Sequence, residues 1–331
     1  MFARILAKRD IVMKKLVLLI VGSFLLTMVS HARVKRVCNA PEVNAEYSSL
    51  ENALMDCAAG DTIYLEASGT EYGPGDAYGF DPIRITKPIT IIGPGYLYKE
   101  NKVVNYTTGE SFIASPLRIY SNNVTLSGLL LNNVEIYGNE CTIAKCQILA
   151  GSQTAIEVAD TVNGCIIRQN FIVGNVQGNG FPQNVNISNN IICGVVSSME
   201  RARIERNTFG KFNRFGGVYN LRFCTLIENV MNYDLKKSRT NTCSFLNNFN
   251  GDFRPDMTNP DFSLDCNYKI KETSKLYDMA SDGDQLGAYG GAMPYVTSGL
   301  QDTPVIESYV AANEANQSVG LEVTIKYKME K

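Results

Sequence analysis

The chain has 331 residues, of which 45% are apolar and 19% are charged, and its formal net charge is −2. This composition is typical of a folded globular protein and argues against a disordered chain. The sequence contains no tryptophan and a single histidine, His31.

Residues 1–32 are predicted to be a secretory signal peptide. Lys14 and Lys15 precede an uncharged apolar run at 16–29, and Ser30-His31-Ala32 has a small residue at each end of a cleavage tripeptide. The run is short for a membrane span, and no later stretch reaches the ~18 apolar residues that a span needs. We therefore expect a secreted, periplasmic or cell-surface protein without a membrane span.

Removal of this segment limits the chemistry of the mature chain. The segment holds five of the 31 Lys/Arg residues and one of the 33 Asp/Glu residues, so a net charge of −6 remains, which argues against a nucleic acid as the partner. His31 is lost as well, so no imidazole is left for a catalytic triad, for another histidine base or for a histidine-ligated metal. We expect neither a cofactor nor a metal.

The first expected element of the mature chain is an amphipathic helix at 46–58. Tyr47, Leu50, Leu54 and Cys57 recur there at helical spacing. We expect this helix to cover the N-terminal opening of the fold. The first strands follow it, in "GDTIYL" at 60–65 and "ITIIG" at 89–93.

A short pattern then recurs every 17 to 24 residues: an apolar residue, any residue, a second apolar residue, two further residues and, in most copies, Asn. Apolar residues at alternate positions indicate strands. A unit this short cannot bury its apolar face unless it stacks on copies of itself. The sequence therefore predicts an all-β fold, a parallel β-helix. Six copies begin at Cys141, Cys165, Val185, Ala202, Cys224 and Cys243, and looser copies begin at Ile89 and Val124.

Equivalent residues of successive coils lie ~4.8 Å apart in such a stack and form columns. The first column is small and apolar, and we interpret its four cysteines as buried free thiols; disulfide bridges are the alternative, with Cys38–Cys57 the first candidate. The last column is expected to form a ladder of stacked amides at a corner, where Asn also tolerates the left-handed backbone of a bend. This ladder comprises Asn170, Asn190, Asn207, Asn229 and Asn248.

The helix, "GDTIYL", "GTEY" at 69–72 and "ITIIG" together resemble the opening of right-handed parallel β-helix proteins of the pectate-lyase-like superfamily, exported bacterial type. Residues 259–291 resemble the closing segment of such proteins, so the resemblance covers roughly 44–296. It implies a right-handed β-helix but no single activity, because the superfamily includes lyases, hydrolases and binding modules. We assign 33–296 to the β-helix domain with its N-terminal cap. Residues 297–331 form a short C-terminal β tail, with strands expected at 304–310 and 321–328.

Two chemistries of this superfamily lack their residues here. Its galacturonan hydrolases carry Asn-Thr-Asp, Asp-Asp and His-Gly motifs, and this sequence has none of them. Calcium-dependent lyases need clustered carboxylates on one groove, whereas the repeats offer only Glu205 and Glu228 on outward positions. A denser acidic group is interpreted as part of a closing loop, with a calcium site as the alternative; it consists of Asp252, Asp256, Asp261 and Asp265.

Elimination from a uronic acid remains compatible with the sequence, because Lys or Arg can neutralise the carboxylate near the proton that is removed. Basic and aromatic residues gather in the later coils. The ligand-binding candidates are Arg168, Arg203, Arg206, Arg214, Tyr219 and Lys236, and the catalytic candidates are Arg203, Arg206, Lys236 and Tyr219. The alternative is a solvated face on which Arg168 and Arg206 pair with Glu205 and Glu228.

These observations favour an exported β-helix protein that binds a polysaccharide or cell-surface glycan, or that serves as a structural module at the cell surface. The alternative is a metal-independent polysaccharide lyase that acts on a uronic-acid-containing glycan. A third class, an adhesin-like assembly protein acting through its edge and tail strands, is compatible with the same sequence.

Overall fold

The computed structural model describes residues 32–73, 81–97, 110–210, 216–232, 239–259 and 264–301, together with the backbone of two strands at 305–311 and 323–328. The chain divides into a unit of residues 1–33 and a unit of residues 34–331. All but the last residue of the predicted signal peptide lies outside the described residues. Among the described residues, no helix has the length and apolar character needed to cross a bilayer.

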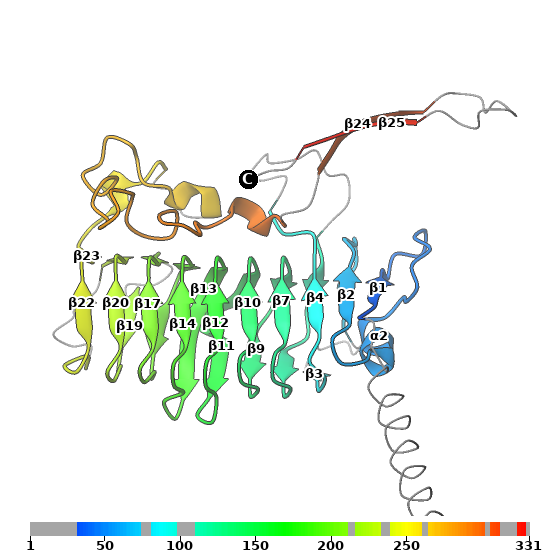
Figure 1. Ribbon diagram of the computed structural model, residues 1–331, viewed down its shortest axis with the longest axis horizontal. Helices are drawn as coiled ribbons and strands as arrows, with labels where there is room; N and C mark the ends of the chain where they lie inside the picture. The colour runs from blue at the N-terminus through cyan, green and yellow to red at the C-terminus, as the bar shows by residue number, and fades with distance from the viewer. Residues whose placement is uncertain are drawn as a thin grey trace, which may run out of the picture. The chain divides into compact units, whose positions relative to one another are not determined.

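Short parallel strands, one from each coil, form a ten-stranded sheet in the second unit. Figure 1 shows these strands side by side and in chain order. They are β1 (Val34–Val37), β2 (Thr62–Leu65), β4 (Thr90–Ile92), β7 (Thr125–Ser127), β10 (Thr142–Ala144), β12 (Ile166–Arg168), β14 (Asn186–Ser188), β17 (Arg203–Glu205), β20 (Thr225–Ile227) and β22 (Ser244–Leu246).

The remaining strands of the coils form a thirteen-stranded sheet, which is also parallel. Its strands are β3 (Ile83–Ile85), β5 (Phe112–Ile113), β6 (Leu117–Ile119), β8 (Leu130–Leu131), β9 (Val134–Ile136), β11 (Gln147–Ala159), β13 (Phe171–Asn179), β15 (Ile191–Ile192), β16 (Val195–Ser197), β18 (Thr208–Phe209), β19 (Gly217–Tyr219), β21 (Val230–Met231) and β23 (Phe249–Asn250).

The strand register follows the repeat pattern of the sequence. Ile143 pairs with Ile167, Ile167 with Ile187, and Ile187 with Ile204. All four side chains point inward and are fully buried, because each coil presents its central apolar residue to the same interior column. The two looser copies, β4 and β7, pair with one another in the same register. The predicted fold class, an all-β parallel β-helix, is therefore confirmed.

The five asparagines of the last column are joined by hydrogen bonds at one corner of the coil. The Nδ2 of Asn190 donates to the Oδ1 of Asn207 at 2.9 Å, and the Nδ2 of Asn207 donates to the Oδ1 of Asn229 at 3.0 Å. Backbone N–H groups follow the same path, because the N–H of Asn190 and that of Asn207 donate to the same two oxygens. Similar bonds join Asn170 to Asn190 and Asn229 to Asn248.

The left-handed backbone of this corner lies one residue earlier than the sequence suggested. At this corner the residues with positive φ are those that precede each ladder asparagine and, one coil earlier, the residue that precedes Cys146. The ladder residues themselves are not among them. We call this set the corner column: Lys145, Gln169, Asn189, Arg206, Glu228 and Asn247, with φ between 49° and 56°. Only two of the six are asparagines, so the ladder bonds and the stacking impose the conformation on residues that seldom adopt it.

The N-terminal cap is shorter than predicted. Helix α2 covers Leu50–Asp56 rather than 46–58, because Ser49 caps it by accepting a hydrogen bond from the N–H of Asn52. Tyr47 instead pairs with β1, where its N–H donates to Arg36 and its carbonyl accepts from Cys38. Strand β1 was not predicted from the sequence, and it buries Lys35 against Asp56 and Tyr47.

After the last coil the chain forms three short 3₁₀ helices, η2 (Arg254–Asp256), η3 (Asp265–Tyr268) and η4 (Thr297–Gly299). The tail strands are β24 (Val305–Ala311) and β25 (Val323–Lys328), which pair antiparallel close to the positions expected from the sequence. All nine cysteines outside the predicted signal peptide are free thiols, so the Cys38–Cys57 bridge considered above is not formed.

Candidate functional site

Residues 264–301 run back along the corner column from the last coils toward the first. We call these residues the closing segment from here on. Gln169 donates to the carbonyl of Pro294 at 2.6 Å, and Asn189 donates to those of Ala288 and Gly290 at 3.0 and 2.8 Å. Further along the stack, Glu228 accepts from the N–H of Ser281 and Asn247 donates to Met279. These four corner side chains thus hold a segment that is distant in sequence.

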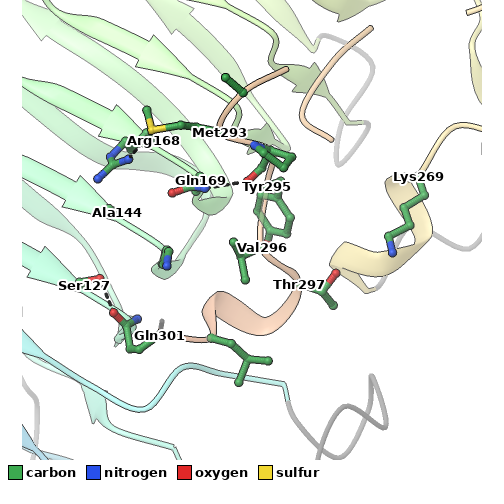
Figure 2. A pocket seen from close by; sticks show the side chains of 14 residues that line it. Ser127, Ala144, Arg168, Gln169, Lys269, Met293, Tyr295, Val296, Thr297 and Gln301 are labelled. Carbon is green, nitrogen blue, oxygen red and sulfur yellow. Dashed lines mark hydrogen bonds between the residues drawn. The ribbon is translucent and has the colours of Figure 1, made fainter. Parts of the chain in front are cut away.

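A cleft of about 660 Å³ lies between the closing segment and the ten-stranded sheet. Ser127, Ala144 and Arg168 line it from the sheet, and Met293, Tyr295 and Thr297 line it from the closing segment (Figure 2). Gln301 closes one end, where the Oγ of Ser127 donates to its Oε1 at 2.9 Å. This volume is in the range of small-molecule sites.

The cleft is electropositive. Lys145, Arg168 and Lys269 line it, whereas no Asp or Glu is among its described lining residues. The guanidinium of Arg168 contacts the Sδ of Met293 at 3.2 Å, and the Lys269 ammonium lies 5.3 Å from the centre of the Tyr289 ring. Charge in a partly enclosed cleft is screened less than on an open surface, so the cations of Arg168 and Lys269 favour an anion here.

Gln169 contributes a polar atom that is not satisfied within the described residues. Its side chain is 6% exposed, its Nε2 is bound to Pro294, and its Oε1 has no hydrogen-bond partner among them. In Figure 2 this oxygen lies on the side of Arg168 and Ala144. A buried acceptor without a partner costs free energy, so this amide is a strained point of the cleft wall.

The wall behind the cleft is fixed by a buried hydrogen-bond network. The Tyr295 hydroxyl donates to Asp265 at 2.8 Å and lies 2.5 Å from the Tyr96 hydroxyl, and the N–H of Ser298 also donates to Asp265. Burial, and then the charge of Asp265, raise the pKa values of both tyrosines well above the usual value. They stay neutral and anchor the closing segment to the early coils.

The sequence-predicted site residues do not meet in one place. Of the ligand-binding candidates in the described part of the chain, only Arg168 lines the cleft. Arg203 is exposed and pairs with Glu205 at 2.6 Å on the open part of the sheet. Tyr219 lies in β19, in the other sheet, where the Arg239 guanidinium is 5.7 Å from its ring centre. Arg214 and Lys236 lie outside the described residues.

Arg206 has a structural position and is not available to a ligand. Its side chain is nearly buried, and its Nη2 lies 2.7 Å from both Glu228 and Asp282. Burial alone would raise the pKa of Glu228, but the Ser281 hydrogen bond and the Arg206 charge hold it below the usual value. The sequence analysis gave salt bridges as the alternative to a binding site, and Arg206 does form one with Glu228. Arg168 does not pair with Glu205 in the described structure and contacts Met293 instead.

The described members of the acidic group near the end of the β-helix are each engaged within the protein. Asp252 pairs with Arg254, Asp256 accepts from Ser274 at 2.7 Å, and Asp265 is buried beneath Tyr295. Among the described residues no three His, Cys, Asp or Glu side chains are grouped as metal ligands require. Asp261 lies outside the described residues.

Sequence reasoning missed Lys145, Gln169 and Lys269. A signal was present for the first two, because both directly precede the last column of the repeat, where the corner side chains point toward the closing segment. No repeat position marks Lys269. It comes to the cleft because the closing segment doubles back, and this long-range contact has no local sequence pattern.

The fold and cleft define this molecule as a parallel β-helix protein with a basic cleft beneath its closing segment. No protein-family model matches the chain, and no curated protein matches it in a sequence comparison.

Proposed function

We propose that this chain is an exported β-helix protein of the pectate-lyase-like type that binds an acidic polysaccharide in the cleft beneath its closing segment. The observation that supports this most directly is the clustering of Lys145, Arg168 and Lys269 around a cavity whose described lining has no carboxylate. Uronate carboxylates or sulfate esters would meet these cations through charge-assisted hydrogen bonds.

Binding is favoured over a purely structural role because Arg168 has no carboxylate partner among the described residues, unlike Arg203 on the same sheet. Arg203, on the same sheet, already has Glu205 as its partner, whereas Arg168 contacts a thioether. A purely structural module gains no stability from an arginine that lies beside a thioether in a region without acidic lining residues. It is useful in a site that receives a negative charge.

The test measures affinity for uronate-containing and sulfated oligosaccharides, with neutral oligosaccharides of equal length for comparison. Arg168→Met is expected to weaken binding of the acidic ligands by about tenfold to a hundredfold, because a charge-assisted hydrogen bond contributes ~1.5–3 kcal/mol. Arg203→Met is the matched control, since it removes one arginine from the same sheet outside the cleft. Equal binding of acidic and neutral ligands, or equal loss in both variants, would contradict the proposal.

The lyase alternative is examined with the same polymers. An unsaturated product absorbs in the ultraviolet, so turnover would be seen directly during incubation. Of the sequence-predicted catalytic residues, Arg203, Arg206 and Tyr219 do not line the cleft, and Lys236 lies outside the described residues. Among the described candidates, Arg168 alone lines it. If the absorbance rises with the wild-type protein and Arg168→Met abolishes this rise, the cleft is the active site of a lyase and the binding proposal is replaced.

A further inference from the structure

The cysteines of the first column come in two stacked pairs from neighbouring coils. Cys141 and Cys165 directly precede β10 and β12, and the N–H of Ile166 donates to the carbonyl of Cys141 at 2.8 Å. Cys224 and Cys243 precede β20 and β22 in the same way, with the N–H of Ser244 donating to Cys224 at 3.0 Å.

Each pair has a backbone spacing compatible with a disulfide bond. Residues in register on adjacent strands are ~4.8 Å apart, and disulfides join Cα atoms that are ~4.4–6.8 Å apart. Both pairs face inward on the same column, so each thiol has the other as its neighbour. Cys38 and Cys57 lie outside this column, in the cap, where the Cys38 thiol faces the carbonyl of Ala67.

The two pairs differ in their access to solvent. Cys141 and Cys165 are fully buried in the middle of the stack. Cys243 is half-buried on the last strand of the sheet, and all three residues of β22 that follow it are exposed. Phe245, which occupies the inward position of that strand, is 37% exposed, whereas its equivalent Leu226 is fully buried. The inward side chain of the last coil is therefore covered less than that of the coil before it.

We propose that Cys224 and Cys243 are a redox-active pair that forms a disulfide bond and fastens the last coil to the stack. The oxidant is a low-molecular-weight disulfide such as oxidised glutathione, or a protein disulfide of the same reactivity. The Cys243 thiolate attacks one sulfur of that disulfide, forms a mixed disulfide and releases one glutathione thiolate. Cys224 then loses its proton, attacks the Cys243 sulfur and releases the second glutathione, so two thiols are oxidised and one disulfide is reduced to two thiols.

The surroundings favour Cys243 as the attacking group. Cys243 is half-buried and Cys224 is buried, so an external disulfide reaches Cys243 first. The neighbouring Cys224 thiol also lowers the pKa of Cys243, which favours its thiolate. The neighbouring Cys243, and then burial, raise the pKa of Cys224. Once Cys243 is in the mixed disulfide it carries no negative charge, so Cys224 loses its proton more readily for the second step. This inference is independent of the proposed glycan binding.

The test incubates the full chain with glutathione buffers of increasing oxidised fraction, then unfolds it, alkylates the remaining thiols and digests it with trypsin. Oxidation is expected to link the peptide 223–236, which contains Cys224, to the peptide 240–269, which contains Cys243 and Cys266. The linked species should weigh two hydrogen atoms less than the sum of the two peptides. The peptides that carry Cys141 and Cys165 should remain alkylated in the same samples, because both thiols are buried.

Two variants assign the bond. Cys243→Ser is expected to abolish the link and Cys266→Ser to leave it intact, and both side chains are only half-buried, so neither replacement opens a core cavity. The oxidised wild-type protein should also lose several degrees of Tm on reduction, and the Cys243→Ser protein should not. Absence of the link in fully oxidised glutathione, its persistence in Cys243→Ser, or an equal rate of linking for Cys141 and Cys165 would each overturn the proposal.

Discussion

At the scale of single residues, the corner of each coil is determined by an asparagine and the residue before it. The asparagine amide bonds to the coils above and below, and the preceding residue takes the left-handed backbone conformation. Neither residue would adopt this arrangement alone, since the ladder bonds offset a backbone strain of ~1–3 kcal/mol per residue.

Replacing one asparagine in the middle of the ladder should be costly. Asn207→Ala removes an amide that donates to Ile187 and to Asn229, and it leaves the N–H of Asn190 without an acceptor. We expect the free energy of unfolding to fall by about 3 kcal/mol, because each buried group left unpaired costs ~1–3 kcal/mol. Urea denaturation measures it, with Asn248→Ala at the end of the ladder as the control with the smaller expected loss.

The Arg206–Glu228 pair gives stability a defined dependence on pH. Because the folded-state pKa of Glu228 lies below its usual value of 4.5, the ionised carboxylate stabilises the fold. This contribution is complete above pH 4.5 and is lost as the pH falls toward the folded-state value, where Glu228 becomes protonated.

We therefore expect Glu228→Gln to lower stability at pH 7 by about 3 kcal/mol, since it leaves a buried arginine with only Asp282 as its partner. Below pH 4.5 the difference between variant and wild type should shrink. Denaturation at a series of pH values measures this. A difference that stays constant down to pH 3 would show that the carboxylate charge is not the cause.

At the scale of elements, the closing segment and the stacked coils depend on close approach at a few points. Gly291 has φ of +83°, and a Cβ at this position would lie 2.4 Å from the Nη1 of Arg206. Gly283 has a similar φ of +81°, but no atom lies within 4 Å of the place its Cβ would take. Alanine at either position has the same unfavourable backbone conformation, but only alanine at 291 would also collide with Arg206. Comparing the two replacements therefore separates the two costs.

Gly291→Ala should loosen the closing segment and Gly283→Ala should not. We expect proteolysis within 284–296 to accelerate by about tenfold in the first variant, because displacing Arg206 weakens the attachment and raises the population of the open segment. Limited proteolysis with mass analysis measures the rate. Equal acceleration in both variants would assign the effect to backbone strain alone.

At the scale of the whole β-helix unit, stability should decline toward the C-terminal end. Successive coils bury the same inward column, but the last inward residue, Phe245, is 37% exposed, and the N-terminal coil is covered by α2. Because a solenoid is stabilised mainly by contacts between neighbouring coils, its least covered coil opens first.

Hydrogen exchange should show this gradient directly. Amides of β14 and β17 are expected to be the slowest, and those of β22 and β23 to exchange at least a hundredfold faster, because their opening does not require the middle coils to separate. Exchange of the full chain followed by peptide mass analysis tests it. Uniform protection from β14 to β23 would show instead that the coils open as one unit.

Apolar residues at helical spacing were sufficient to predict an N-terminal capping helix, and the repeat was sufficient to predict the parallel β-helix and the register of its coils. These features follow from patterns that recur locally, namely alternating apolar residues and an asparagine at a fixed offset, which each coil must repeat in order to bury its face. The start of α2 was set by Ser49 and by the pairing of Tyr47 with β1, which is a contact between segments and not a periodicity.

The cleft was decided by the tertiary structure alone. Arg168 was identified from its outward position, but its availability depends on Met293 being its neighbour and not Glu205, and the burial of Arg206 depends on Asp282 in a segment 76 residues away. A repeat determines which side of a strand a residue faces. Only the return of the closing segment along the corner column determines which of these outward residues are paired, which are covered and which are left to meet a ligand.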